Sequence, residues 1–570
     1  MIFFSNEKRD TNSYTIGTLF GPWSPQAATA FKALLSARLC AAVWSNISDC
    51  DETFNYWEPS HYLIHGTGFQ TWEYSPLYAI RSYFYLWIYA FPALIYTLLL
   101  QTNKVLVFYY TRCILALCCA LCETYFYNFR GVLRQFGPNI ARLVLCFLVL
   151  SSGMFISSTA FLPSSFSMYM TLLIYGAWLQ QHYRVVILTV ATSSLIGWPF
   201  SVILSLPVIV DLFLMKKRRM FFVKWSAILG SAITLPLIAI DSYYYGKVVI
   251  APVNIVLYNV FSKHGANLYG VEPWHYYFIN CFLNFNLVFV IALLVLPIMV
   301  TCKFAIKSKR NIVNSSHWIC LAALYLWFLV FFPQSHKEER FLYPIYPLLC
   351  LCAAFALEMV HKAISNIVPK LSYFYSMCIL LFIVVFTILS FMRCLAVYKG
   401  YHAPMDTYME LGRIHQEYNV TSLKQPINVC VGKEWHRFPN SFFLPDTDHW
   451  KLQFIKSEFS GQLPKPFSTE AGATRKIPSH MNDMNREEPS RYIEVADCHF
   501  LIDSDYPESA EFDPPYSRMS NDWEVIFSYS FLDNRNSPHF WRAFYVPFVT
   551  EMKCSYVKYN LLRSKHLQFN

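Results

Sequence analysis

The sequence is short of charged residues, and this shortage indicates the class of protein. Only 14% of its 570 residues are charged, whereas soluble domains carry about a quarter. Hydrophobic residues make up 55% and aromatic residues 18%. This composition predicts a membrane protein. The net charge of +10 does not indicate nucleic-acid binding, because the clearest basic clusters, at 216–219 and 303–310, lie between apolar segments.

Signatures of nucleotide chemistry and of repeated modules are also missing. The sequence has no Walker loop, no nucleotide-sugar Rossmann unit and no internal repeat of fixed period. Residues 1–24 lack the basic, apolar and small-residue order of a cleaved signal peptide. No basic patch accompanies a soluble fold, so nucleic acid is not an expected partner.

Cysteine is not scarce, but its positions do not predict a disulfide scaffold. Most of the 17 cysteines lie inside apolar segments, where cysteine packs as a small buried residue. Cys119 and Cys122 have metal-ligand spacing, yet no histidine or second pair accompanies them, so we expect no metal site there. Four cysteines outside the apolar segments could pair in an oxidising compartment, with their connectivity open: Cys50, Cys430, Cys498 and Cys554.

Apolar segments follow one another as far as residue 392. The first, 25–48, has Lys32 and Arg38 toward its start, which predicts a cytoplasmic N-terminal side and a lumenal loop after it. The run 185–214 is interrupted at 197–199 and fits either one broken helix or two short ones. Each further segment is about long enough to span a bilayer; they lie near 83–100, 105–127, 139–158, 164–180, 185–214, 222–240, 282–302, 317–333, 341–360 and 372–392.

The last part of the chain, 393–570, loses the long apolar runs. Its short alternating pieces predict strands at 427–431, 492–495, 523–529 and 543–549, and thus a lumenal α/β domain after a membrane module of residues 1–392. Among three glycosylation sequons, we expect Asn419 in this domain to be the acceptor. The sequon at Asn46 lies close to the bilayer, and the one at Asn314 is expected on the cytoplasmic side.

An acidic and aromatic stretch, CDETFNYWEP at 50–59, directly follows the first apolar segment. Asp49, Asp51 and Glu52 place three carboxylates within four positions at the membrane edge. Acidic groups at this depth are costly, which makes them candidates for function. Trp57 and Trp72 add aromatic faces of the kind that hold sugars. The alternative is an acidic helix N-terminus within an interfacial aromatic belt.

A cationic cluster stands in another predicted lumenal loop, QSHKEERF at 334–341. His336, Lys337 and Arg340 oppose the positive-inside trend there, and binding a phosphate would explain them, with Glu338 and Glu339 in supporting roles. The alternative is an internally paired helix start. A third, aromatic loop at 241–281 is expected to form a wall of the site without assigned chemistry.

Carboxylates, cations and aromatic surface on one face of a membrane suit sugar transfer from a lipid phosphate. A carboxylate would take the proton of the acceptor hydroxyl, and the cations would stabilise the departing phosphate. A lipid-linked donor also explains the missing nucleotide-binding motifs. We expect Asp51 to be the base and Glu52 the less favoured choice, because adjacent side chains point in different directions.

Long motifs in the sequence resemble a known family. The stretches CDETFNYWEP at 50–59 and FQTWEYSP at 69–76 closely resemble the endoplasmic-reticulum α-1,2-mannosyltransferases that extend the dolichol-linked N-glycan precursor. Five further motifs match as well, so the likeness covers nearly the whole chain: FLPSSF at 161–166, DSYYYG at 241–246, HKEERF at 336–341, VGKEW at 431–435 and NDMN at 482–485.

The resemblance implies a polytopic α-helical membrane protein of GT-C glycosyltransferase fold, with its active site facing the lumen. It implies dolichyl-phosphate mannose as donor and dolichyl-diphosphate oligosaccharides as acceptors, which would receive their seventh and ninth mannoses. The implied reaction is inverting and uses no metal or cofactor. Within the matching motif, we expect Tyr56, Trp57 and Glu58 to contact the acceptor.

Two alternatives stay open at this point. Relatives that make the α-1,6 linkage or act on glycosylphosphatidylinositol anchors usually read His-Pro-Asp-Glu where this chain has DCDE at 49–52, which favours the α-1,2 assignment. A polytopic lipid or solute transporter could use the same charges as a translocation path. Transporters typically show inverted repeats with paired broken helices, and the one clear break is at 197–199.

Overall fold

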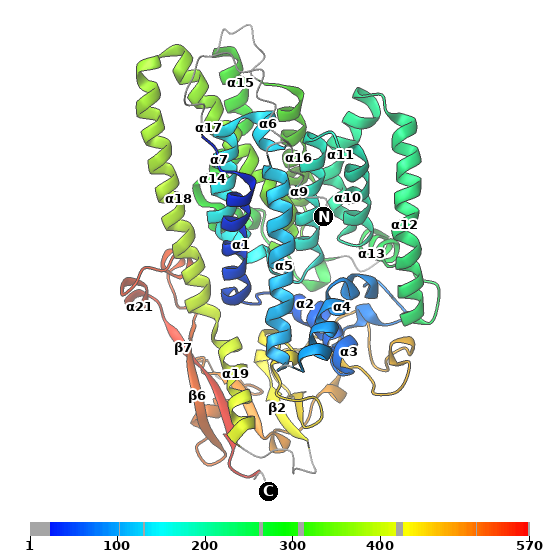
Figure 1. Cartoon of the computed structure of the whole chain (residues 1–570). Coiled ribbons are helices and arrows are strands. Elements are labelled where there is room, and N and C mark those ends of the chain that lie inside the picture. Colours follow the sequence, from blue (N-terminus) through cyan, green and yellow to red (C-terminus); the bar gives the residue numbers. More distant parts are fainter. Residues whose placement is uncertain are drawn as a thin grey trace.

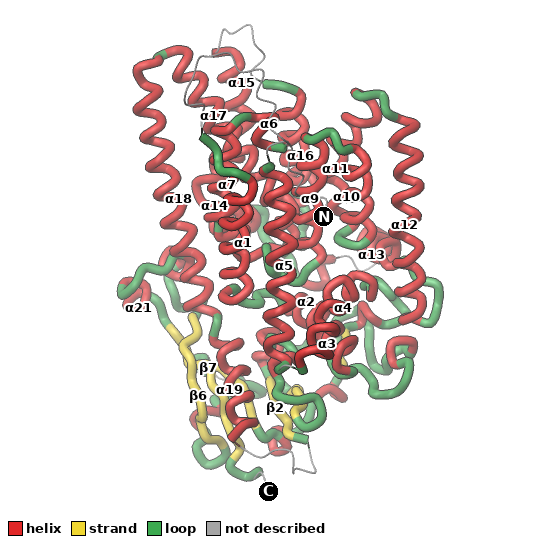
Figure 2. Tube along the Cα trace, viewed as in Figure 1, coloured by secondary structure: helices red, strands yellow, loops and turns green. Residues whose placement is uncertain are grey.

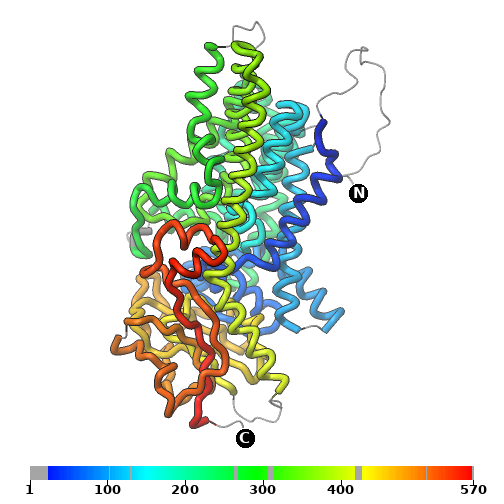
Figure 3. Tube along the Cα trace, turned by 90° about the vertical axis from the view of Figure 1, so that its left-hand side faces the viewer, coloured from blue at the N-terminus to red at the C-terminus, as the bar shows by residue number. Residues whose placement is uncertain are grey.

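A long helical bundle and a smaller sheet domain follow one another along the chain (Figure 1). The computed structural model describes residues 23–567 apart from 102, 129–130, 262–265, 306–312, 418–425 and 509. Helices fill the bundle, and the strands gather at one end of it (Figure 2), which we call the domain end. The first described helix begins toward the opposite end, and the last strand lies in the sheet domain (Figure 3).

The bundle is built from apolar helices that run between its two ends. Seven helical stretches of the described chain are long and apolar enough to cross a membrane, as the composition predicts. The helices of the bundle are α1 (Ala27–Trp44), α5 (Lys104–Tyr127), α6 (Val132–Phe136), α7 (Pro138–Leu150), α8 (Ser152–Ser157), α9 (Pro163–Leu179), α10 (Tyr183–Leu195), α11 (Val202–Val210), α12 (Arg219–Tyr245), α14 (Tyr276–Leu293), α15 (Val295–Ala305), α16 (Ser315–Phe331), α17 (Tyr346–Ile367) and α18 (Ser372–Tyr401).

Helix α4 (Tyr83–Leu100) does not follow the course predicted from the sequence, in which 83–100 spans the bilayer. Its first turn donates from Phe84 N to Asp241 Oδ1 at 3.0 Å, near the end of α12 where Thr474 of the sheet domain binds the carbonyl of Tyr244. Just after α4, Lys104 Nζ donates to the carbonyl of Ser441 in the sheet domain at 3.3 Å. Both ends of α4 therefore lie at the domain end. The segment is apolar enough to cross a membrane, yet it packs across the end of the bundle.

The break at 197–199 separates two helices, α10 and α11, which resolves the open reading of the run 185–214. At the break, Trp198 N donates to Ser167 Oγ of α9 at 3.0 Å. Gly197 is needed at this turn because a Cβ would come within 2.8 Å of the same Ser167 Oγ. This close approach holds Trp198 at the domain end of the bundle.

Four further helices, α2 (Cys50–Glu52), α3 (Glu58–His65), α4 and α13 (Ala251–Phe261), lie at the domain end (Figure 1). A π-helical turn, Thr53–Trp57, joins α2 to α3. The two-residue strands β1 (Phe69–Gln70) and β4 (Lys465–Pro466) pair antiparallel, so the first loop is hydrogen-bonded directly to the sheet domain.

The sheet domain contains a mixed five-stranded sheet of order β3-β2-β5-β7-β6, in which β3, β2 and β5 are parallel and β7 is antiparallel to its neighbours. Its elements are α19 (Ala403–Glu417), β2 (Ile427–Val431), β3 (Trp450–Phe454), β5 (Phe500–Ser504), β6 (Trp523–Leu532), α20 (His539–Ala543), α21 (Val549–Lys553) and β7 (Tyr556–Ser564). The expected strands at 427–431 and 523–529 are confirmed. Those at 492–495 and 543–549 are wrong, because the first forms only a single bridge and the second joins α20 to α21.

Contacts between the sheet domain and the bundle are extensive. A single hydrophobic core runs through both and includes Phe54, Tyr408 and Phe438. Helix α18 extends beyond residue 392 to Tyr401, close to the start of α19. A disulfide joins Cys430 of β2 to Cys498, while Cys50 and Cys554 are free thiols. The domain is therefore packed directly on the end of the bundle where the loops gather.

The three sequons have different surroundings. Asn46 donates to the carbonyl of Val397 at 3.0 Å, at the junction of α1 and α18. Asn314 caps α16 in a capping box with His317. Asn419 lies outside the described residues, so its glycosylation stays a prediction.

Candidate active site

A cavity of about 790 Å³ opens where the loops of the bundle meet the sheet domain. Its walls come from segments far apart in sequence: the loop 49–81, the start of α9, the turn at 198–203, α13, the loop 330–341, and residues 435–485 of the sheet domain. Of the residues expected in the site, Asp51, Tyr56, His336, Glu338 and Arg340 line this cavity. The fold therefore brings the carboxylate loop and the cationic loop to one place.

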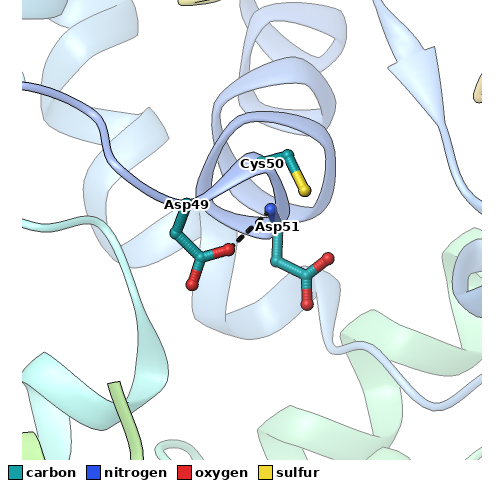
Figure 4. Close-up of side chains that lie close together, drawn as sticks. All are labelled: Asp49, Cys50 and Asp51. Carbon is teal, nitrogen blue, oxygen red and sulfur yellow. Dashed lines mark hydrogen bonds between the residues drawn. The ribbon is translucent and has the colours of Figure 1, made fainter. Parts of the chain in front are cut away.

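Asp51 and Glu52 are neighbours in sequence but face different surroundings. Asp49 is the N-cap of α2, and its Oδ1 accepts from Asp51 N at 2.9 Å (Figure 4). The carboxylates of Asp49 and Asp51 face the cavity. Glu52 is 4% exposed, and its Oε1 accepts from Trp57 Nε1 and from Phe161 N, each at 2.9 Å. Glu52 thus fastens the loop to the start of α9.

Arg340 joins the two loops through charge. Its Nη1 lies 3.0 Å from Asp49 Oδ2 and its Nη2 lies 2.5 Å from Asp51 Oδ2, and it also pairs with Glu338. Burial opposes ionisation of Asp51, but Arg340 and Arg81 outweigh it and lower its pKa below the ordinary value. Burial raises the pKa of Asp49 to about 7, although Arg340 opposes this. Asp51 is therefore the more fully ionised carboxylate of the pair at neutral pH.

A second ion pair lines the cavity and was not found from the sequence. Arg81 Nη2 and Nε bind Glu73 at 2.8 and 2.9 Å, and Arg81 Nη1 donates to Tyr56 Oη at 2.6 Å. The signal for Arg81 was present, because it is a cation in a predicted lumenal loop and runs against the same positive-inside trend as Arg340. Arg81 orients Tyr56 and adds positive charge beside Asp51.

The cationic loop divides between the cavity and the protein interior. His336 lines the cavity, with Nδ1 2.9 Å from the carbonyl of Gly270 and Nε2 3.1 Å from Glu338; its hydrogen bond to Glu338 raises its pKa. Lys337 is buried and donates to the carbonyls of Glu272 and Gln334, outside the cavity lining. Glu339 also lies outside the lining and accepts from Asn284 Nδ2 at 2.8 Å. Lys337 and Glu339 therefore shape the loop.

Of the three expected acceptor contacts, only Tyr56 lines the cavity. Trp57 is 1% exposed and packs on Phe108 with ring centroids 4.5 Å apart. Glu58 is fully buried and accepts from Phe69 N, Ser441 N and Ser441 Oγ at 2.9, 2.5 and 2.8 Å. Burial raises the pKa of Glu58 to about 7. The geometry thus packs Trp57 on α5 of the bundle, and Glu58 joins the loop to the sheet domain.

An aromatic wall faces the cavity from α13 and the first loop. Trp72 lies 5.0 Å from Tyr258 and 6.5 Å from Tyr269 between ring centroids. Asp483 of the sheet domain accepts from Tyr78 Oη at 3.0 Å and lies next to this wall. Gln462 also lines the cavity, and its Nε2 is buried without a hydrogen-bond partner in the part of the chain that the structure describes. The expected wall from the loop 241–281 is present in Tyr258 and Tyr269.

An apolar wall faces the cavity from the bundle. Trp198 stacks on Phe341 with ring centroids 5.0 Å apart and packs against Phe331 at 5.3 Å. Ile203 of α11 and Val330 of α16 extend this wall. The same two helices also line an apolar groove further along the bundle, formed by Leu206, Pro207, Val210, Met215, Ser315, Trp318, Ile319, Ala322 and Leu326.

Within the described residues, Asp49, Cys50 and Asp51 form a group whose potential ligand atoms all lie within 4.8 Å of one another (Figure 4). Arg340 already binds both carboxylates, so a cation bound there would meet the guanidinium charge at close range. The two carboxylates are better described as the ion-pair partners of Arg340 than as a metal site.

The protein is a polytopic helical module with an aromatic cavity at one end. The cavity holds an ionised carboxylate and two arginines, each in an ion pair with carboxylates. These features are those of a membrane glycosyltransferase. The model of the Alg9-like mannosyltransferase family matches residues 29–445. The chain belongs to this family, and the GT-C architecture predicted from the sequence is confirmed by that membership.

Relatives with assigned activities match along almost the whole chain. The α-1,2-mannosyltransferase ALG9 of Mus musculus is 51% identical over 95% of this chain and 90% of its own length. ALG9 of Saccharomyces cerevisiae is 35% identical over 88% of this chain and 89% of its own length. The crystal structure of ArnT from Cupriavidus metallidurans bound to undecaprenyl phosphate matches 88% of this chain and 95% of that chain, with 12% identity and a TM-score of 0.49. The chain is thus a mannosyltransferase of N-glycan precursor synthesis that uses lipid-linked sugars.

Proposed function

We propose that this protein transfers mannose in α-1,2 linkage from dolichyl-phosphate mannose to dolichyl-diphosphate oligosaccharides, adding the seventh and ninth mannoses. The observation that carries the proposal is the pairing of Asp51 with Arg340 in one cavity, because a base and a cation for a phosphate are the two groups this reaction requires. The family membership supports the sugar and the linkage.

The reaction follows from the charges of the site. Asp51 takes the proton of an acceptor hydroxyl while that oxygen attacks the anomeric carbon of the donor mannose. The bond between that carbon and the phosphate oxygen breaks with inversion, and its electron pair leaves with the phosphate. The dolichyl phosphate gains a negative charge, which Arg340 and His336 stabilise, so no acid is needed to protonate it. Arg81 holds Tyr56 and keeps Asp51 ionised.

The two walls suit the two substrates. The apolar wall at Trp198 and Phe341 suits the polyprenyl chain of the donor, because α11 and α16 continue as an apolar groove. The aromatic wall at Trp72 and Tyr258 suits the sugars of the acceptor, since aromatic faces with a few placed polar groups are typical of ligand sites. The free amide donor of Gln462 would meet a sugar hydroxyl there.

We propose that the cavity faces the lumen of the endoplasmic reticulum. The disulfide between Cys430 and Cys498 supports an oxidising compartment for the sheet domain. Arg134 in α6 and Lys216 after α11 lie away from the domain end, which agrees with the positive-inside trend. A glycan on Asn419 removable by endoglycosidase, with none on Asn314, is the expected result. Degradation of 393–570 by protease outside sealed microsomes would contradict it.

Transfer in vitro tests the proposal directly. The purified chain in lipid receives dolichyl-phosphate mannose and defined lipid-linked oligosaccharides that lack the seventh or the ninth mannose. We expect one mannose to be added to each acceptor and to be removed by an α-1,2-specific mannosidase. A product resistant to that enzyme would indicate an α-1,6 linkage, and movement of lipid without transfer would support the transporter alternative.

The acceptor wall has its own test. Trp72→Ala removes the central ring of the wall, and we expect the KM for the oligosaccharide acceptor to rise by roughly 10-fold, the order of a lost stacking contact. The KM for the donor should stay near that of the wild type. Trp274→Ala is the matched control, because Trp274 is exposed and lies outside the cavity lining. Equal effects of the two substitutions would exclude this wall as the acceptor contact.

A further inference from the structure

Helix α9 begins at the cavity with a first turn that no side chain caps. Its N-cap residue, Leu162, has no acceptor group, and Pro163 at the first position has no N–H. The N–H groups of Ser164 and Ser165 follow in the first turn, where the helix itself provides no carbonyl to accept them. Leu162, Pro163 and Ser164 line the cavity. The motif FLPSSF thus ends at the site, although the proposed chemistry does not use it.

The serine hydroxyls at this helix end are unused as well. Ser164 is 5% exposed and lines the cavity, and its Oγ has no hydrogen-bond partner among the described residues. Ser165 is fully buried, and its hydroxyl likewise has no hydrogen-bond partner among the described residues. Buried hydroxyls are nearly always paired, so a buried donor at the edge of a cavity indicates a missing partner. Such a partner would be an acceptor of hydrogen bonds.

The nearest acidic group does not fill this position. Glu52 accepts from Phe161 N, before the helix begins, and from Trp57 Nε1. Glu52 therefore does not cap the first turn of α9. The positive end of the helix dipole remains available to an anion in the cavity.

Arg340 lines the same cavity as this helix end but is already paired with several carboxylates. Helix α9 packs against the segment Glu339–Ile345, which carries Arg340. The guanidinium is shared by Asp49, Asp51 and Glu338, so its single charge is already offset by carboxylates of the protein. An incoming phosphate needs additional donors that bring no further acidic partners. Backbone N–H groups and a serine hydroxyl have this property.

We infer that the N-terminus of α9, through the N–H groups of Ser164 and Ser165 and the hydroxyl of Ser164, binds the phosphate of the lipid-linked donor opposite Arg340. This inference rests on the proposed function, in which that phosphate leaves the mannose. The phosphodiester becomes a phosphomonoester with one more negative charge. A helix N-terminus binds the phosphate of the donor, and binds the leaving phosphate more strongly because of this extra charge, so it contributes both to donor affinity and to a lower barrier.

Two substitutions at one position test the inference. Ser164→Ala removes the hydroxyl, and we expect the KM for dolichyl-phosphate mannose to rise by roughly 10-fold. Ser164→Asp places a carboxylate in the first turn, where it favours the helix but occupies the anion position. We expect a rise in donor KM of roughly 100-fold or more, weaker inhibition by free dolichyl phosphate, and a thermal midpoint no lower than that of the wild type.

The acceptor carries a diphosphate, so the KM for each substrate is measured separately. A rise in acceptor KM with an unchanged donor KM would assign this helix end to the acceptor diphosphate and overturn the inference. Ser205→Ala is the matched control, because Ser205 is buried on α11 with an unpaired hydroxyl and lies outside the cavity lining. Its donor KM should equal that of the wild type.

The outcomes also separate this inference from the proposed function. If the wild-type protein does not use dolichyl-phosphate mannose, the proposed function itself fails. If the wild type transfers mannose and both Ser164 variants keep the wild-type donor KM, only the role of α9 is excluded. Should Ser164→Asp fail to accumulate, Ser164→Ala decides the question, since alanine fits any helical position that serine occupies.

Discussion

The acidic residues of the first loop form two groups that differ in their partners. The cavity group, Asp49 and Asp51, shares one charged partner, the side chain of Arg340. The anchor group, Glu52 and Glu58, accepts hydrogen bonds from backbone N–H groups of distant segments, among them Phe161 and Ser441. The side chain of Arg340 can turn from these carboxylates to a substrate. The backbone N–H groups that bind the anchor group cannot, because they are fixed in the fold. The partners of these acids thus distinguish the carboxylates proposed for the reaction from those that hold the loop in place.

Removing the proposed base, Asp51, should have the largest effect. Asp51→Asn keeps the shape of the side chain and removes its basicity, so we expect turnover to fall by roughly 10²-fold or more. Acceptor binding and the thermal midpoint should stay near wild-type values. Glu52→Gln retains an oxygen that can accept from Trp57 and Phe161, so turnover should change little. If Glu52→Gln lost turnover and Asp51→Asn kept it, the two groups would have to be exchanged.

Arg340→Ala tests the exchangeable partner of the cavity group. A charged hydrogen bond contributes about 1.5–3 kcal/mol, so the donor KM should rise by roughly 10- to 100-fold. His336→Ala should act in the same direction with a smaller effect. Arg475→Ala is the control, because Arg475 binds the carbonyl of Tyr243 outside the cavity lining. A donor KM unchanged in Arg340→Ala would leave Arg340 as an internal ion-pair partner only.

Substitution in the anchor group should lower the stability of the protein. Glu58→Ala leaves Phe69 N, Ser441 N and Ser441 Oγ without their acceptor, at a cost of about 1–3 kcal/mol for each buried donor. We expect a lower thermal midpoint and less protein in the membrane. The KM values of the molecules that fold should stay close to those of the wild type. A stable Glu58→Ala protein with raised acceptor KM would instead place Glu58 in the acceptor site.

The pKa difference within the cavity group predicts a small pH effect. Asp49, with a pKa of about 7, binds a proton below that pH and is charged above it, whereas Asp51 stays charged throughout. The cavity therefore becomes more negative as pH rises through 7. The donor KM should rise several-fold, as expected for about 1 kcal/mol between unit charges at about 4 Å in water. His336 loses its proton in the same direction, so the comparison with Asp49→Asn isolates Asp49.

In Asp49→Asn the part of the pH dependence due to Asp49 should disappear, while that of His336 remains. The measurement is donor KM at pH 6 to 8 for both proteins in the same lipid. A variant with the pH profile of the wild type would show that Asp49 does not titrate in this range. Wild-type KM independent of pH would exclude the titration of both residues.

The sequence alone determined the class of protein and the two charged loops. Low charge and long apolar segments identify a membrane protein because every buried backbone group must be satisfied within a helix. Asp51 and Arg340 were predictable because charges near a membrane are costly and need a function. Arg81 carries the same signal, but it was not among the residues predicted for the site. Strands with clear alternation, β2 and β6, were also predicted correctly.

The direction of each side chain and the course of α4 depend on tertiary contacts and could not be predicted from the sequence. Periodicity does not tell whether an apolar helix crosses the bundle or lies on its end, because both surroundings bury the same residues. Likewise, Trp57 and Glu58 belong to the same motif as Tyr56, but their partners, Phe108 and Ser441, come from segments distant in sequence. The role of a residue depends on such partners, and hydrogen bonds and packing between distant segments exist only once the chain is folded.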